Sequence, residues 1–138
     1  MADTIRDLMT KSPASVEPST TVVEAAKRMA GEDVGPLPIV DGGRVVGIVT
    51  DRDLVVRVLA EELDPQATTV GEIASSELVT VSPDTDLDEA LRLMARHQVR
   101  RLPVTENGEL IGIVAQADIA RTTPDQETGE VVEEISKP

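Results

Sequence analysis

The fold of this chain is decided by the stretch Gly47-Ile48-Val49-Thr50-Asp51-Arg52-Asp53. The apolar end of a strand runs directly into Thr50 and Asp51, which are residue types that cap helices, and an apolar-periodic segment follows. The stretch therefore predicts a strand, a tight corner and a helix. Such a corner aims backbone N–H groups, a hydroxyl and a carboxylate at one point beyond the strand, which suits an anionic or polyhydroxyl ligand.

The same corner recurs 65 residues later as Gly112-Ile113-Val114-Ala115-Gln116-Ala117-Asp118. The offset holds without a gap from the pair Val16 and Val81 to the pair Asp53 and Asp118, so the chain is one unit written twice. A unit this short is not expected to bury its apolar face alone, and we therefore expect the two halves to pack on each other.

Composition argues against a nucleic-acid partner. The chain has 138 residues, about one ordinary domain, and contains no Phe, Tyr or Trp, so Val, Ile, Leu, Ala and Met must form its core. No aromatic ring is present on which a base could stack. The net charge of −13 would in addition repel a phosphate backbone.

Composition also argues against an enzyme. With no cysteine and one histidine, His97, the chain lacks a Cys/His or Ser/His/Asp set, a thiolate or histidine metal site and a GxxxxGK[ST] loop. We expect His97 to be a helix-end residue rather than a ligand, and we expect no metal site. No stretch approaches the ~20 apolar residues of a membrane span, and the N-terminus has no cleavage-site pattern, so a soluble cytoplasmic protein is expected.

Each half is expected to hold a helical turn, a short strand, a helix, a hairpin and a second helix. Capping-box spacing marks the leading turns at Thr4 to Asp7 and Thr69 to Glu72, and a third box at Thr21 to Glu24 opens the first long helix. Turns at Gly42-Gly43 and Asn107-Gly108, between apolar runs, predict the hairpins because their residues tolerate positive φ.

The helices carry apolar stripes at helical spacing. Met29 and Met94 lie on the stripes of the two long helices and are expected in the core. After Asp53, a helix is expected to carry on one side Leu54, Val55, Val58 and Leu59.

These patterns divide the chain into four parts: residues 3–60 as repeat one, 61–68 as a linker, 69–122 as repeat two and 123–138 as an acidic tail. The tail is expected to be solvated, with Val131, Val132 and Ile135 leaving open a short docked helix.

Two motifs resemble the CBS family. They are Leu37-Pro38-Ile39-Val40 followed by a Gly-Gly turn and Val46-Gly47-Ile48-Val49-Thr50-x-x-Asp53, and a second copy that includes Arg100-Arg101-Leu102-Pro103-Val104. The likeness covers about residues 3 to 122, and two copies without an attached domain look like a stand-alone CBS pair (Bateman module) of the hypoxic-response type. The resemblance implies an α+β fold of two β-α-β-β-α repeats packed as an intramolecular pseudo-dimer, with two clefts between them.

The resemblance also implies ligands and partners. CBS pairs commonly bind adenosyl ligands such as AMP, ADP, ATP, S-adenosylmethionine or NAD, and they usually form homodimers. Asp53 and Asp118 stand where the family's ribose-binding carboxylate stands, and a carboxylate offers two acceptor oxygens to the two hydroxyls of a ribose. Thr50 matches the hydroxyl at the strand end and Arg52 a position that faces phosphate.

The two copies differ in their expected phosphate contacts. Arg100 and Arg101 match the family's basic pair, where the first copy has Gly35-Pro36, whereas the second copy has Ala115 and Ala117 in place of Thr50 and Arg52. The expected walls of the adenine slots are Pro13 and Ala14 with Ile48, and Leu78 and Val79 with Ile113.

Several of these residues have a simpler interpretation. Asp53 and Asp118 could be helix-end charges, Thr50 only a cap, and Arg100 and Arg101 surface partners of carboxylates. Asp51 would repel a bare phosphate at the first site.

Two functions therefore compete. The first is a regulatory module that binds an adenine nucleotide or another adenosyl ligand between the repeats. The alternative is a CBS-type scaffold for protein interaction that binds no ligand.

Overall fold

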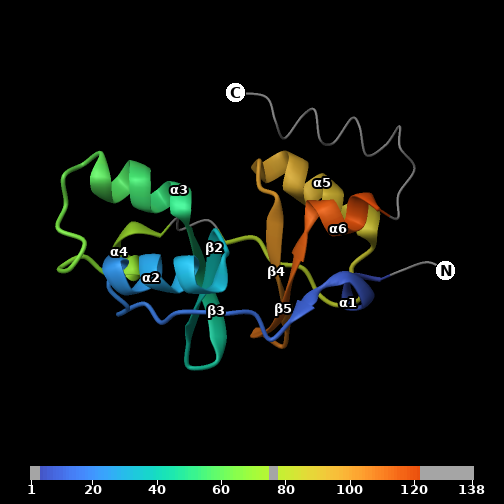
Figure 1. Cartoon of the computed structure of the whole chain (residues 1–138). Coiled ribbons are helices and arrows are strands. Elements are labelled where there is room, and N and C mark those ends of the chain that lie inside the picture. The colour runs from blue at the N-terminus through green and yellow to red at the C-terminus, as the bar shows by residue number, and fades with distance from the viewer. Residues whose placement is uncertain (1–3, 75–77, 122–138) are drawn as a thin grey trace. The chain divides into compact units, whose positions relative to one another are not determined.

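The computed structural model describes residues 4–74 and 78–121, which form two compact units (Figure 1). One unit, called here the first-repeat unit, lies within Ala14–Leu78. The other, the second-repeat unit, combines residues of Met1–Pro13 with residues of Val79–Pro138. The expected acidic tail, 123–138, lies outside the described residues.

The first-repeat unit is built around a two-stranded hairpin. The antiparallel strands β2 (Pro36–Asp41) and β3 (Arg44–Thr50) meet at Gly42 and Gly43, whose φ angles of 61° and 85° give the predicted turn. Val16 adds a single parallel bridge to β2 at Ile39. The helices of this unit are α2 (Val22–Glu32), α3 (Asp51–Leu54), the π-helix η1 (Val55–Leu59) and α4 (Val70–Ile73).

The second-repeat unit repeats this plan and adds one strand. Strand β5 (Glu109–Ala115) pairs antiparallel with β4 (Arg101–Glu106) and with the short β1 (Thr10–Lys11). Its turn residues Asn107 and Gly108 have φ angles of 56° and 84°. The helices are α1 (Ile5–Leu8), α5 (Leu87–His97) and α6 (Gln116–Ala120).

Each unit has its own aliphatic core, and each core receives the leading turn of the other repeat. Ile5 of α1 is fully buried in the cluster that contains Leu91 and Met94. Val70 and Ile73 of α4 lie in the cluster that contains Met29. The expectation that the two methionines are core residues is confirmed, since their exposures are 6% and 0%.

The structure confirms the mixed α+β class with antiparallel strands and the predicted helix starts. Thr4 and Asp7 form a capping box at α1, and Thr21 and Glu24 form one at α2. At α4, the Thr69 N–H donates to the Glu72 carboxylate over 3.1 Å.

The prediction for the segment after Asp53 is wrong in part. Leu54 and Val58 are buried, but Val55 and Leu59 are 54% and 65% exposed. The segment winds as a π-helix, with the Ala60 N–H donating to the Val55 oxygen over 2.9 Å. Only the Leu54/Val58 side contacts the core, so the remaining apolar side chains form an exposed face.

Within the described ranges, none of the helices is both long and apolar enough to cross a membrane.

Candidate functional site

The first corner lies at the end of β3, where Thr50 is both the last strand residue and the N-cap of α3. The Thr50 hydroxyl accepts the Asp53 N–H over 3.2 Å, and Asp53 Oδ2 accepts the Thr50 N–H over 2.8 Å. Asp53 Oδ1 also lies 3.7 Å from Arg57 Nε. Asp53 Oδ2 is thus engaged by the Thr50 N–H, Oδ1 makes only a long pair with the half-exposed Arg57, and Thr50 acts as the helix cap that the simpler interpretation expected.

Asp51 makes this first corner more acidic. Its N–H donates to the Gly35 oxygen over 3.0 Å, and a Cβ placed on Gly35 would lie 3.1 Å from its Oδ1. The carboxylate therefore lies against Gly35, in contact range of the position that an arginine occupies in the second repeat. Arg52 is exposed, and its backbone N–H donates to Asp51 Oδ1 over 3.0 Å.

The second corner lies at the end of β5. Arg101 pairs with Ala115 in the β4–β5 ladder, and the Gln116 N–H donates to the Arg100 oxygen over 2.8 Å. The fold thus brings the Arg100-Arg101 backbone beside the start of α6, which carries Asp118. Both arginines are exposed.

Asp118 differs from Asp53 in its surroundings. The N-cap residue of α6 is Ala115, so no side-chain hydrogen bond caps this helix. The Asp118 side chain is 31% exposed and its Oδ1 lies 3.5 Å from Arg121 Nη1. An exposed ion pair of this kind is weak, because solvent screens it, and the carboxylate remains accessible to a ligand hydroxyl.

Sequence reasoning missed Gln116, the first residue of α6. Its side chain is only 8% exposed, and its buried Nε2 has no hydrogen-bond partner among residues 4–74 and 78–121. Alignment of the two repeats could have identified this residue, because Gln116 is equivalent to Asp51 and has an amide in place of the carboxylate.

The expected walls of the adenine slots divide between the units. The first-repeat unit contains Ala14, half-buried against its core, together with Ile48 and Leu78. The second-repeat unit contains Pro13, Ile113 and Val79, of which Val79 packs against its core. Ile48 and Ile113 are both half-buried strand residues next to their corners.

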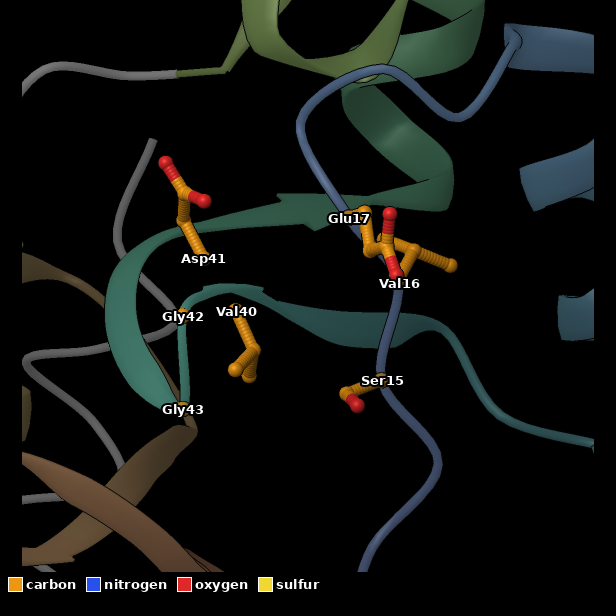
Figure 2. Close-up of a pocket in the computed structure, with 7 residues that line it drawn as sticks. All are labelled: Ser15, Val16, Glu17, Val40, Asp41, Gly42 and Gly43. Carbon is orange, nitrogen blue, oxygen red and sulfur yellow. The ribbon is translucent and has the colours of Figure 1, made fainter.

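A surface pocket of about 470 Å³ lies at the opposite end of the first hairpin (Figure 2). It is lined by Ser15, Val16, Glu17, Val40, Asp41, Gly42 and Gly43. None of the predicted site residues lines it, and its two charged side chains, Glu17 and Asp41, are carboxylates. This pocket therefore does not suit a phosphate.

Within residues 4–74 and 78–121, no group of three or more His, Cys, Asp or Glu side chains is placed to hold a metal ion. His97 is the last residue of α5 and is half-buried.

Comparison with known proteins gives a consistent result. The family model described as "CBS domain" matches residues 5–60 and 70–125. Hypoxic response protein 1 of Mycobacterium tuberculosis is 40% identical over 136 residues, which cover 98% of this chain and 95% of that protein. The crystal structure of Hypoxic Response Protein I with two coordinated zinc ions matches with a TM-score of 0.80 and 42% identity, over 87% of this chain and 98% of that one.

Two similar structures contain adenosyl ligands. The CBS domain pair of protein MJ0100, in complex with 5-methylthioadenosine and S-adenosyl-L-methionine, matches with a TM-score of 0.78 and 28% identity, over 88% of this chain and 95% of that one. CBSX2 in complex with AMP matches with a TM-score of 0.74 and 31% identity, over 86% of this chain and 94% of that one.

Proposed function

The chain belongs to the CBS domain family, as a tandem pair, and we propose that it is a regulatory module that binds an adenosyl ligand. The main support for this proposal is the second corner. There, two arginines lie at the end of one strand, beside a helix that has no side-chain cap and carries the accessible Asp118. The module acts by binding rather than by catalysis.

The chemistry of the second corner fits a nucleotide. Asp118 offers two acceptor oxygens to the two hydroxyls of a ribose. Arg100 and Arg101 supply guanidinium donors, which match the geometry of phosphate oxygens. Val79 and Ile113, in the same unit, offer aliphatic surface to the base.

The first corner fits a ligand without phosphate. The Asp53 carboxylate already pairs with the Thr50 N–H and with Arg57. Asp51 adds a second negative charge that would repel a phosphate. A nucleoside-like group, or one whose charge a cation neutralises, is the better match for this corner.

The similar structures support the ligand class. MJ0100 was crystallised with 5-methylthioadenosine and S-adenosyl-L-methionine, and CBSX2 with AMP. These ligands share the adenosyl group and differ in the presence of phosphate, which is the property in which the two corners differ.

We also propose that the protein forms a homodimer through the exposed face of the segment that follows α3. This face, called here the η1 face, consists of Val55, Val56, Leu59 and Leu63, whose exposures are 54%, 46%, 65% and 43%. These four large apolar side chains lie between Val55 and Leu63, and their exposure to water is unfavourable. A second copy offers the same patch and would cover it.

The alternative function, an interaction scaffold without ligand, is favoured by one observation. Thr50 and Asp53 are fully explained as a helix cap, so the first corner needs no ligand to account for its residues.

Ligand binding can be tested on the purified protein. Because the chain has no Trp, Tyr, Phe or Cys, absorbance at 260 nm reports almost wholly on co-purified nucleotide. AMP, ADP, ATP or S-adenosylmethionine at 100 times its Kd should stabilise the fold by ~2.7 kcal/mol, measured as a rise in Tm. No absorbance at 260 nm and no rise with any of the four would favour the scaffold.

The Asp118→Ala variant should abolish the rise in Tm caused by AMP, because it removes the ribose acceptor. Asp53→Ala is the matched control at the other repeat. It should lower Tm without ligand by removing a cap, worth ~1 kcal/mol, but should keep the AMP-dependent rise. Unchanged AMP binding by Asp118→Ala would contradict the ribose assignment.

A further inference from the structure

Gln116 is a buried polar side chain whose donor is not used. Its exposure is 8%, and its Nε2 has no hydrogen-bond partner within the part of the chain that the structure describes. The large majority of buried polar side-chain atoms in folded proteins are paired, because an unmade bond to a buried donor destabilises the fold. An unpaired amide at this position therefore needs an explanation beyond packing.

The position of Gln116 links this amide to the second corner. Its backbone N–H donates to the Arg100 oxygen over 2.8 Å, and the preceding residue, Ala115, pairs with Arg101 in the β4–β5 ladder. Asp118 follows Gln116 on α6, with Ala117 between them. The unpaired donor thus belongs to the residue that joins the arginine pair to the candidate ribose carboxylate.

The first repeat shows what changes at this place. The equivalent residue, Asp51, makes the same backbone bond, to the Gly35 oxygen over 3.0 Å, but its side chain is an exposed carboxylate. A carboxylate only accepts hydrogen bonds and repels an anion, whereas an amide nitrogen donates to one. The same backbone geometry therefore places an anion-repelling acceptor in the first repeat and a hydrogen-bond donor in the second.

On the basis of the proposed function, we propose that Gln116 is a ligand-selecting residue whose side-chain N–H donates to a phosphate oxygen, so that the second corner prefers a phosphorylated nucleoside. In the free chain the donor is buried and unpaired, which costs stability. Rotation of the side chain toward a phosphate beside Arg100 and Arg101 makes the missing bond and recovers that cost. An unphosphorylated nucleoside has no anionic oxygen there and gains nothing from Gln116.

The test compares AMP with adenosine on the native protein and on Gln116→Met, which keeps the length of the side chain but removes the donor. Isothermal titration calorimetry should show AMP affinity falling by about tenfold or more, the effect of losing one hydrogen bond to a charged group, with adenosine affinity changed less than about twofold. Without ligand, Gln116→Met should raise Tm by a few degrees, since it removes the unpaired donor. Gln116→Glu should weaken AMP binding further, because its charge repels the phosphate.

Any other pattern of AMP and adenosine binding would overturn the inference. An equal loss for AMP and adenosine would mean that Gln116 shapes the whole site, and no loss for either would mean that it only fills space; both overturn the inference and leave ligand binding intact. If the native protein binds AMP, ADP, ATP, S-adenosylmethionine and adenosine not at all, the proposed function fails and the inference fails with it. A matched exchange at the other corner, Asp51→Gln, should leave AMP affinity for the second corner unchanged.

Discussion

Asp53 and Asp118 are the same residue type at equivalent positions of the two repeats, but their side chains have different roles. The sequence aligns them as equivalent carboxylates at two strand ends. In the structure, the two carboxylates differ because their N-cap residues differ. Thr50 forms a capping box with Asp53, whereas Ala115 has no side-chain oxygen with which to form one with Asp118. The side chain that is not needed for the helix start is the one we propose for ribose.

A second matched pair of residues, Gly47 and Gly112, should differ in tolerance to a methyl group. A Cβ at Gly112 would lie 2.6 Å from Met9 Sδ and 2.9 Å from the Thr10 oxygen, whereas a Cβ at Gly47 meets only ordinary contacts at 3.6 Å and 3.8 Å. Gly112→Ala should therefore destabilise the protein by about 1–3 kcal/mol, because the leading segment must move away from β5.

Urea unfolding measures both glycine variants. Gly47→Ala is the control and should change the free energy of unfolding by less than about 1 kcal/mol. Equal effects of the two substitutions would contradict the close approach of the leading segment to β5.

At the scale of the element, helix starts in this protein are set by bonds between residues three apart. At α2, the Thr21 N–H and hydroxyl donate to Glu24 Oε1 over 3.1 Å and 2.9 Å, and the Thr21 hydroxyl oxygen accepts the Glu24 N–H over 3.2 Å. These bonds, first from the Thr21 backbone and then from its side chain, lower the pKa of Glu24 from its ordinary value of 4.5.

This shift predicts a pH dependence of stability. Because the pKa of Glu24 is lower in the folded than in the unfolded chain, its stabilisation is fully present above pH 4.5 and is lost as pH falls through the folded pKa. Thermal unfolding of the native protein and of Glu24→Gln, which cannot titrate, should show a difference in Tm at pH 7 that shrinks below pH 4.5.

Glu32, an exposed residue at the end of the same helix, supplies the control, since Glu32→Gln removes a carboxylate without touching the capping box. A Tm difference between native and Glu24→Gln that stays constant from pH 7 to pH 3 would show that the box does not depend on the charge of Glu24.

At the scale of the whole molecule, two features depend on residues far apart in the sequence. The leading turns of the repeats join the core of the other repeat, as Ile5 and Val70 show, so neither repeat as defined by sequence is complete alone. None of the residues that the structure describes covers the η1 face, which is why we propose a second copy as its partner.

The homodimer can be tested by placing a charge in the η1 face. Leu59→Lys should convert a two-chain mass to a one-chain mass in light scattering, because a buried unpaired ammonium strongly opposes association. Val46→Lys is the control, since Val46 is 50% exposed on β3 and lies outside the η1 face. A native protein that is monomeric at high concentration, or a dimeric Leu59→Lys, would reject this interface.

Local patterns in the sequence determined the duplication, the hairpin turns, the capping boxes and the apolar stripes of α2 and α5. Each depends on residues within a few positions of one another, whose hydrogen bonds and spacing are visible in the sequence itself. The candidate corners were predicted for the same reason, since strand, cap and helix follow in direct succession.

Which side chains at those corners already have partners follows from the three-dimensional packing alone. Burial and pairing depend on what packs against a residue from elsewhere in the chain. The sequence therefore could not show that Asp53 is bonded to the Thr50 N–H, that the buried Gln116 Nε2 has no partner among the described residues, or that Val55 and Leu59 face solvent. Local sequence patterns determine where the helices and strands lie. Packing between distant segments determines which of their side chains are buried, paired or free to bind.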